Sequence, residues 1–242
     1  MTASPKGVFF DLDDTLYDHM KPLRAALQAV LTLPEDFPCE DAYHRFRYHT
    51  DTLSAALEGS FNEGNTAAME DVRVARFVHT LADYGIHISE EQGRQLQDSY
   101  ISRQFDIEMF EGAEQLLTTL RDQGYVVGVI TNGLEKHQMK KIRKLELDKL
   151  LSPERIFASG AVGYDKPDAR IFHYVNEQTG TLPEDCIYVG DSWRNDVMGT
   201  KEAGWTMIWF NHRDVPPESE YRPSYVARNY ADLNRLLLQE KV

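Results

Sequence analysis

The sequence GVFFDLDDT, residues 7–15, decides how this chain folds, because a short apolar run ends directly in a cluster of carboxylates. A continuous apolar run of this length is typical of a strand that is buried on both faces, as in a parallel sheet. The next comparable run is YVVGVI, residues 125–130, far along the chain. The two runs predict two core strands, separated by a segment of a different kind.

That segment has a helical pattern from about residue 20 to residue 104. Apolar residues recur at helical spacing in 23–31 and again in 74–81. The sequence SEEQ at 89–92 fits a capping box that opens a further helix, and the glycines of 59–64 mark a loop. The pattern therefore predicts about four helices that form a small bundle.

The rest of the chain alternates between strand and helix, which is typical of a parallel sheet with helices on both faces. We expect a doubly wound α/β core made of residues 1–16 and 109–242, with a helical cap domain inserted over residues 17–108. The further expected elements are strands at 156–158, 187–189 and 207–210, helices at 113–124, 135–147, 168–180 and 231–239, a helix ending at Gly204, and a loop over 213–223.

Composition narrows the classes of function. The net charge of -13 disfavours a protein that binds nucleic acid or lies on an anionic membrane. The longest apolar runs are strand-sized, so none is expected to span a membrane. The two cysteines, Cys39 and Cys186, lie far apart and form no Cys-x-x-Cys pair, which favours reduced thiols in a cytoplasmic protein.

Polar residues follow the predicted strands at their carboxyl ends, where the ligand sites of parallel sheets lie. Carboxylates gathered there repel one another unless a cation lies among them, and oxygen ligands suit Mg²⁺. A lysine and hydroxyl or amide groups beside such an ion fit a phosphate site, and Thr131, Asn132 and Lys166 are the candidates for it. The full set is Asp11, Asp13, Asp14 and Thr15 after the first strand, Thr131 and Asn132 after the second, Lys166 beyond the third, and Asp191, Asn195 and Asp196 after the fourth.

These residues resemble the four motifs of the haloacid dehalogenase superfamily, in the family's order and at its spacings. The motifs are Asp11-x-Asp13-x-Thr15, Thr131, Lys166, and Gly190-Asp191 followed by Asn195-Asp196. The resemblance covers nearly the whole chain, because a helical insertion after the first motif is similar to the family's mobile cap. It implies a phosphohydrolase fold and chemistry.

The resemblance implies a role for each residue. Asp11 is the implied nucleophile that forms an aspartyl-phosphate, and Asp13 the implied general acid and base. Asp11, the backbone carbonyl of Asp13, and Asp191 are the implied Mg²⁺ ligands. Thr131 and Lys166 are implied to hold the phosphoryl oxygens, and Asp196, beside Asn195, is implied to orient Lys166 or a metal-bound water.

Within the superfamily, Asp13 argues against dehalogenation, because a halide leaving group needs no proton. The stretches 130–133, 162–168 and 209–211 resemble the pyrimidine 5'-nucleotidase branch, which implies nucleoside monophosphates as substrates. Phe110-Glu111-Gly112 departs from the Pro-Gly that many relatives carry after the cap, which bears on the stiffness of the hinge.

Two alternatives stay open: a sugar-phosphate phosphatase or phosphomutase with the same core, and a regulatory relative without turnover. Either way the expected partner is a small phosphorylated metabolite, and the oligomeric state is not indicated.

Other conspicuous residues have plainer interpretations. Asp14 is interpreted as a structural carboxylate in a turn, and His44 and His49 as surface residues. His19 lies near the expected hinge, where it could reach a substrate, and Trp193 could pack at the rim of the site or line its entrance. The cap aromatics are expected to form the core of the bundle rather than to stack on a base: Tyr43, Phe46, Tyr48, Phe61, Phe77, Tyr100 and Phe105.

Overall fold

The computed structural model describes residues 6–55 and 66–239, and the chain divides into two compact units. One unit is Met1–Asp18 with Glu108–Val242, and the other is His19–Ile107. The expected boundaries of the inserted segment, at residues 17 and 108, differ from these by two residues and one. The predicted loop at 59–64 and the interpretation of Phe61 lie outside the described residues.

The first unit is built on a parallel sheet of six strands with the order β3-β2-β1-β4-β5-β6. Every pair of neighbours is parallel, and every residue of β1 and β4 is buried, as the apolar runs predict. The strands are β1 (Gly7–Phe10), β2 (Val126–Thr131), β3 (Ile156–Ala158), β4 (Cys186–Gly190), β5 (Thr206–Phe210) and β6 (Tyr225–Ala227). The predicted doubly wound α/β sheet is therefore confirmed.

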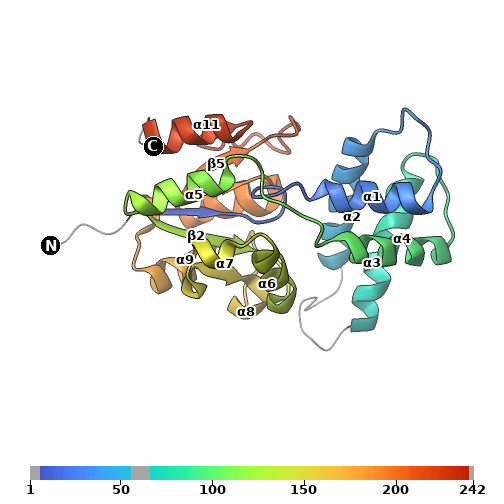
Figure 1. Ribbon diagram of the computed structural model, residues 1–242, viewed down its shortest axis with the longest axis horizontal. Coiled ribbons are helices and arrows are strands. Elements are labelled where there is room, and N and C mark those ends of the chain that lie inside the picture. Colours follow the sequence, from blue (N-terminus) through green and yellow to red (C-terminus); the bar gives the residue numbers. More distant parts are fainter. Residues whose placement is uncertain (1–5, 56–65, 240–242) are drawn as a thin grey trace. The chain divides into compact units, whose positions relative to one another are not determined.

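Helices cover both faces of this sheet. In Figure 1, α5 (Ala113–Asp122) and α11 (Tyr230–Asn234) lie on one side of the strands and α9 (Ala169–Thr179) on the other, where α10 (Met198–Ala203) packs against α9. The remaining helices are α6 (Glu135–Lys144), α7 (Leu147–Leu150) and α8 (Ser159–Val162).

The expected elements differ from the observed ones in several places. The first strand, expected over residues 7–12, ends at Phe10, and the short helix α8 is not among the predicted elements. The helix expected over 135–147 ends at Lys144, because Glu146 adopts a left-handed conformation with φ 56° before α7 begins. The edge strand β6 was not predicted, since three residues, two of them exposed, are too short for a periodic pattern. The helix expected over 231–239 begins as α11 and continues as a π-helical turn, Arg235–Gln239.

The core between the sheet and α9 is dominated by aromatic rings. Phe9 of β1 contacts Trp205 with ring centroids 5.1 Å apart, and Trp205 contacts Phe172 of α9 at 5.3 Å. Phe172 also meets Tyr188 of β4 edge to face at 5.3 Å. Such interlocked rings leave few alternative packings, so the strand ends that carry the polar residues rest on a rigid support.

The second unit is a bundle in which the described residues form α1 (Met20–Val30), α2 (Cys39–Ala55), α3 (Thr66–Ala82) and α4 (Glu90–Arg103). The predicted capping box opens α4, since Ser89 and Gln92 exchange both hydrogen bonds. Of the cap aromatics, Tyr43, Phe46, Phe77 and Tyr100 are buried in the bundle core as expected, whereas the Tyr48 side chain is exposed.

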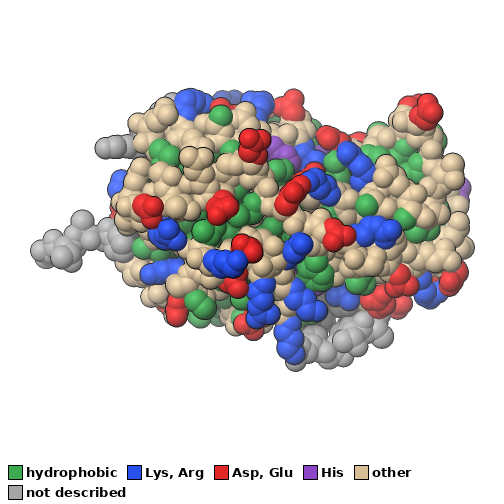
Figure 2. All heavy atoms as spheres, viewed as in Figure 1, with side chains coloured by type: hydrophobic (Ala, Val, Ile, Leu, Met, Phe, Trp, Pro, Cys, Tyr) green, Lys and Arg blue, Asp and Glu red, His purple; other side chains and the backbone are tan. Residues whose placement is uncertain are grey.

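The surface of the described residues mixes both signs of charge. Figure 2 shows acidic and basic side chains interspersed on the visible face. Among the described residues, no helix combines the length and apolar character that a membrane crossing requires. Cys186 is buried and Cys39 is half-buried, and both are thiols without a disulfide.

Candidate active site

The site lies where β1 and β4 end side by side, at the point where the strand order reverses direction. Asp11 follows β1, and its backbone N–H donates to the Val189 carbonyl at 2.8 Å, so the chain stays bonded to β4 just beyond the last residue of β1. Asp191 follows β4. Asp11, Asp191 and Asp196 each offer a carboxylate oxygen, and these three atoms lie within 4.8 Å of one another.

This donor set fits a hard divalent cation. All three groups are carboxylates, two of them are buried, and oxygen ligands of this kind are those that Mg²⁺ takes. Three negative charges in so small a volume repel one another, and a cation among them would relieve that repulsion. The acidic cluster is therefore suited to a metal ion.

Lys166 lies in the middle of this charge. Its Nζ is 2.7 Å from Asp11 Oδ1, 2.7 Å from Asp196 Oδ1 and 2.8 Å from the Tyr188 hydroxyl. The Asn132 side chain forms two hydrogen bonds with the backbone of Lys166. Its Oδ1 accepts from the Lys166 N–H at 2.9 Å, and its Nδ2 donates to the Lys166 carbonyl at 2.8 Å. The Asn132 side chain, predicted to bind phosphate, thus has its donor and its acceptor engaged with the backbone that carries the lysine.

The two central groups have perturbed acidities. Burial raises the pKa of Asp11 from its ordinary value of 3.8 to about 7, helped by the charges of Asp196 and Asp13 and opposed by Lys166. Burial by itself lowers the pKa of Lys166, but the carboxylates of Asp11 and Asp196 outweigh it and raise that pKa above its usual value. Lys166 therefore stays protonated at neutral pH, whereas Asp11 changes between its protonated and ionised forms near pH 7.

Asp196 is placed by the irregular turn that follows β4. It lies in the π-helical turn Trp193–Val197, and its Oδ2 accepts the Ser192 N–H at 2.9 Å. Gly190 makes room for it, because a Cβ there would come within 2.5 Å of the Asp196 carboxylate. Ser192 caps the turn by accepting the N–H of Asn195 at 3.2 Å, so Asn195 takes part through its backbone.

Asp13 is bound by residues that sequence reasoning missed. Lys141 Nζ lies 2.8 Å from both of its carboxylate oxygens, and the Tyr17 hydroxyl donates to Oδ1. Gln138 Nε2 lies 3.4 Å from Asp13 Oδ2 and donates to the Thr131 hydroxyl at 2.5 Å. The available signal was the spacing of Gln138 and Lys141, one turn apart on the helix that follows β2.

The contacts of Asp14 and Trp193 are those of residues that support the structure. Asp14 is buried with φ 64°, and Arg213 donates to both of its oxygens at 2.7 Å, which fits the expected turn carboxylate. Trp193 is buried, meets Trp209 edge to face at 4.8 Å, and donates to Ser219 at 3.2 Å. Of the two positions considered for Trp193, the structure therefore shows packing.

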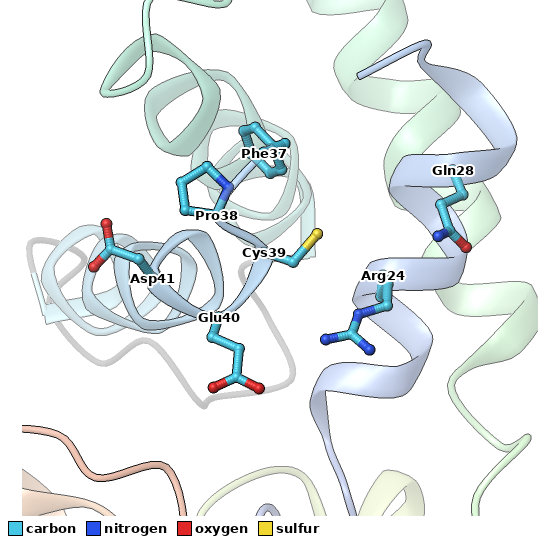
Figure 3. A pocket seen from close by; sticks show the side chains of 7 residues that line it. All are labelled: Arg24, Gln28, Phe37, Pro38, Cys39, Glu40 and Asp41. Atoms are coloured by element: carbon cyan, nitrogen blue, oxygen red, sulfur yellow. The ribbon is translucent and has the colours of Figure 1, made fainter. Parts of the chain in front are cut away.

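The helical unit has polar features of its own. His19 binds two tyrosines of the bundle, with Nδ1 3.0 Å from the Tyr43 hydroxyl and Nε2 2.9 Å from that of Tyr100. A pocket lies between α1 and the start of α2, where Arg24 extends from α1 toward the first turn of α2 (Figure 3). Its lining is Arg24, Gln28, Phe37, Pro38, Cys39, Glu40 and Asp41.

Comparison with known proteins places the chain among hydrolases. The family described as haloacid dehalogenase-like hydrolase matches residues 8–210. The chain is 30% identical over 239 residues to the HAD-hydrolase YfnB of Bacillus subtilis, covering 96% of this chain and 95% of that protein. The structure of YfnB, bound to magnesium, matches with a TM-score of 0.72 at 25% identity over 98% of this chain and 100% of that one.

Two further relatives carry the names of phosphatases. The chain is 29% identical over 224 residues to the glyceraldehyde 3-phosphate phosphatase of Pyrococcus furiosus, which covers 86% of this chain and 81% of that protein. It is 26% identical over 229 residues to the pyrimidine 5'-nucleotidase PynA of Streptococcus pneumoniae, which covers 94% of this chain and 93% of that protein.

Proposed function

The chain belongs to the haloacid dehalogenase-like hydrolases, and we propose that it is a Mg²⁺-dependent phosphatase of small phosphomonoesters that acts through an aspartyl-phosphate on Asp11. The observation that carries the proposal is the placement of Lys166 between Asp11 and Asp196, with Asp191 close enough to share a cation with them. Phosphoryl transfer needs positioning and charge neutralisation above all, and this arrangement supplies both.

The proposed reaction has two steps. An Asp11 oxygen attacks phosphorus, the bond from phosphorus to the ester oxygen breaks, and Asp13 gives that oxygen a proton. Water then attacks phosphorus and gives a proton to Asp13, and the bond to Asp11 breaks to release inorganic phosphate. Asp13 acts on both leaving group and water, which explains why a carboxyl group follows the nucleophile so closely in sequence.

The other residues hold the phosphoryl group and the cation. Lys166 neutralises phosphoryl oxygens next to Asp11, and the Thr131 hydroxyl, which accepts from Gln138, can donate its own proton to another of them. Asp11, Asp191 and the backbone carbonyl of Asp13 would hold Mg²⁺, which neutralises phosphoryl charge when bound. Asp196 and Asn132 keep Lys166 in place.

Residues 17–108 act in this proposal as a cap that closes over the substrate and excludes bulk water. The structure of the relative YfnB is described as one that reveals interdomain movement, which supports a mobile helical unit here. The residues that choose the substrate would then lie in the cap, whereas the core supplies the chemistry common to the family.

Nucleoside 5'-monophosphates are the first substrate candidates, supported by the similarity to PynA and by the stretches 130–133, 162–168 and 209–211. Small sugar phosphates are the second, supported by the similarity to the glyceraldehyde 3-phosphate phosphatase. Two of the three stretches have internal partners, since Trp209 donates to the Asp191 carbonyl at 2.8 Å and Asn132 clasps Lys166. These two stretches therefore support the structure of the core, and they say less about which substrate the protein selects.

Phosphate release from a panel of nucleotides and sugar phosphates, with Mg²⁺ or with a chelator, tests the proposal. We expect release that needs Mg²⁺ and is lost in Asp11→Asn, because the amide cannot form the phosphoryl intermediate. Asp122→Asn, which changes an exposed carboxylate on the core, should leave the rate unchanged. Release that persists in Asp11→Asn would contradict the covalent route, and interconversion of isomers without release would identify a mutase.

A further inference from the structure

The helix α6 turns two polar side chains toward the catalytic carboxylates. Its buried residues are Gln138, Lys141 and Ile142. A buried lysine loses hydration and rotamer freedom, so it persists where a partner compensates for both. The partner of Lys141 is Asp13, which it binds through both carboxylate oxygens at 2.8 Å.

Two lysines bind three of the carboxylates of the site. Lys166 binds Asp11 and Asp196, and these two form the cation cluster together with Asp191. The Asp13 side chain is absent from that cluster and is paired with Lys141 instead. Lys166 thus pairs with two acids of the cluster, and Lys141 pairs with Asp13 outside it.

We infer that Lys141 is a positioning residue that keeps the Asp13 carboxyl group out of the cation cluster and aimed at the ester oxygen; the inference rests on the proposed function. The two contacts from one ammonium fix the direction in which the carboxylate points, and the Tyr17 hydroxyl and Gln138 amide restrict its rotation. One face of Asp13 stays accessible, since its side chain is 21% exposed. A proton donor needs this combination of a fixed direction and an open face.

Loss of Lys141 should weaken proton donation more than phosphoryl binding. An alkyl phosphate requires a proton on its leaving oxygen as the ester bond breaks, whereas p-nitrophenolate leaves without one. For Lys141→Met we expect kcat/KM to fall about 100-fold with an alkyl phosphate and less than about 10-fold with p-nitrophenyl phosphate. Lys141→Arg should recover part of the loss, and Lys144→Met, at an exposed position of the same helix, should match the wild type.

Equal losses with both esters would overturn the inference, because they would identify Lys141 as a phosphate-binding residue or a purely structural one. An unchanged kcat/KM in Lys141→Met would overturn it as well. Asp13→Asn, measured with the same pair of esters, should show the same selectivity between leaving groups, and a combined variant should lose little more than either single one.

A Mg²⁺ titration by calorimetry tests the inference without turnover, so that failure of the proposed function is seen separately. In Lys141→Met the Asp13 carboxylate loses the group that holds it aside, and we expect Mg²⁺ to bind several-fold more tightly. Lys141→Met should not increase the Mg²⁺ affinity when Asp13 has already been replaced by Asn. An equal gain in both backgrounds would show that Lys141 acts by charge alone and would overturn the inference, even if no phosphate ester is hydrolysed.

Discussion

At the scale of single residues, opposing interactions set the pKa of Asp11. Its burial and the neighbouring charges of Asp196 and Asp13 favour the protonated form, whereas Lys166 favours the ionised one. The first influences prevail in the metal-free protein, and its pKa rises to about 7. As the proposed nucleophile, Asp11 would gain its charge most readily with a cation bound beside it, which would couple its reactivity to the metal.

This shift predicts how the stability of the metal-free protein depends on pH. The folded-state pKa of Asp11, about 7, exceeds its unfolded value of 3.8, so the folded protein binds the extra proton and stability falls as pH rises through that interval. Between pH 5.5 and 8 the wild type should lose about 2 kcal/mol of unfolding free energy more than Asp11→Asn does.

Urea denaturation with a chelator present, at the two pH values, measures this difference. Groups far from Asp11 titrate equally in both proteins and cancel in the comparison. Identical losses in the wild type and Asp11→Asn would show that Asp11 is ionised at acidic pH even without a metal.

At the scale of elements, the loop after β1 depends on the loop after β5. Asp14 sits in the left-handed region and is buried, so its charge needs a partner from elsewhere in the chain. Arg213 provides it with two hydrogen bonds of 2.7 Å and also binds Asp18 at 2.7 Å. One guanidinium therefore holds the loop that carries Asp13 at two points.

Removal of that guanidinium should be costly because the buried Asp14 carboxylate loses two hydrogen bonds of 2.7 Å, whereas His212 Nε2 lies farther away, at 3.4 Å. We expect Arg213→Met to lower the unfolding free energy by about 3 kcal/mol and the added change Asp14→Asn to restore at least half of that loss. Asparagine suits the restored loop because it tolerates a positive φ. Urea denaturation of the single and double variants measures the coupling.

The matched control is Arg228→Met, which breaks an ion pair with Asp214 whose side chains are 62% and 79% exposed. It should change the unfolding free energy by less than about 0.5 kcal/mol. Additive effects of the Arg213 and Asp14 substitutions would show that the two side chains contribute independently.

At the scale of the whole molecule, two units with separate cores share one chain. The segments that lead out of the core and back into it pair with each other: Tyr17 forms a bridge with Met109, and the Phe110 N–H donates to the Leu16 carbonyl at 2.9 Å. The connection to the helical unit is therefore a double strand of backbone anchored next to Asp13. Motion of a cap would be transmitted to the site through these segments.

Closure of the cap predicts a change in hydrogen exchange. With Mg²⁺ and beryllium fluoride, which mimics a phosphoryl group on aspartate, amides of residues 19–107 should exchange more slowly than in the metal-free protein. Asp11→Asn, which cannot hold the mimic, should show no such protection. Exchange in this segment that stays the same in the wild type would contradict a closing cap.

The sequence by itself determined most of the elements and the edge of the sheet at which the polar residues gather. The apolar run of residues 7–12 predicted a buried parallel strand. Asp11 and Asp191 directly follow β1 and β4, and Thr131 is the last residue of the neighbouring β2. The capping box at Ser89 was readable as well. These features depend on residues close in sequence or on a repeating pattern, which is why no tertiary information was needed.

Only the tertiary structure decided which side chains meet. Lys141 and Asp13 are separated by 128 positions, and Arg213 and Asp14 by 199. Periodicity shows that a helix face is buried but does not show what it is buried against, so a buried lysine is indistinguishable from a surface one until the helix is packed. The partners of Asp11, Asp13 and Asp14 therefore follow from the packing of the elements, because contact between distant residues depends on the whole fold.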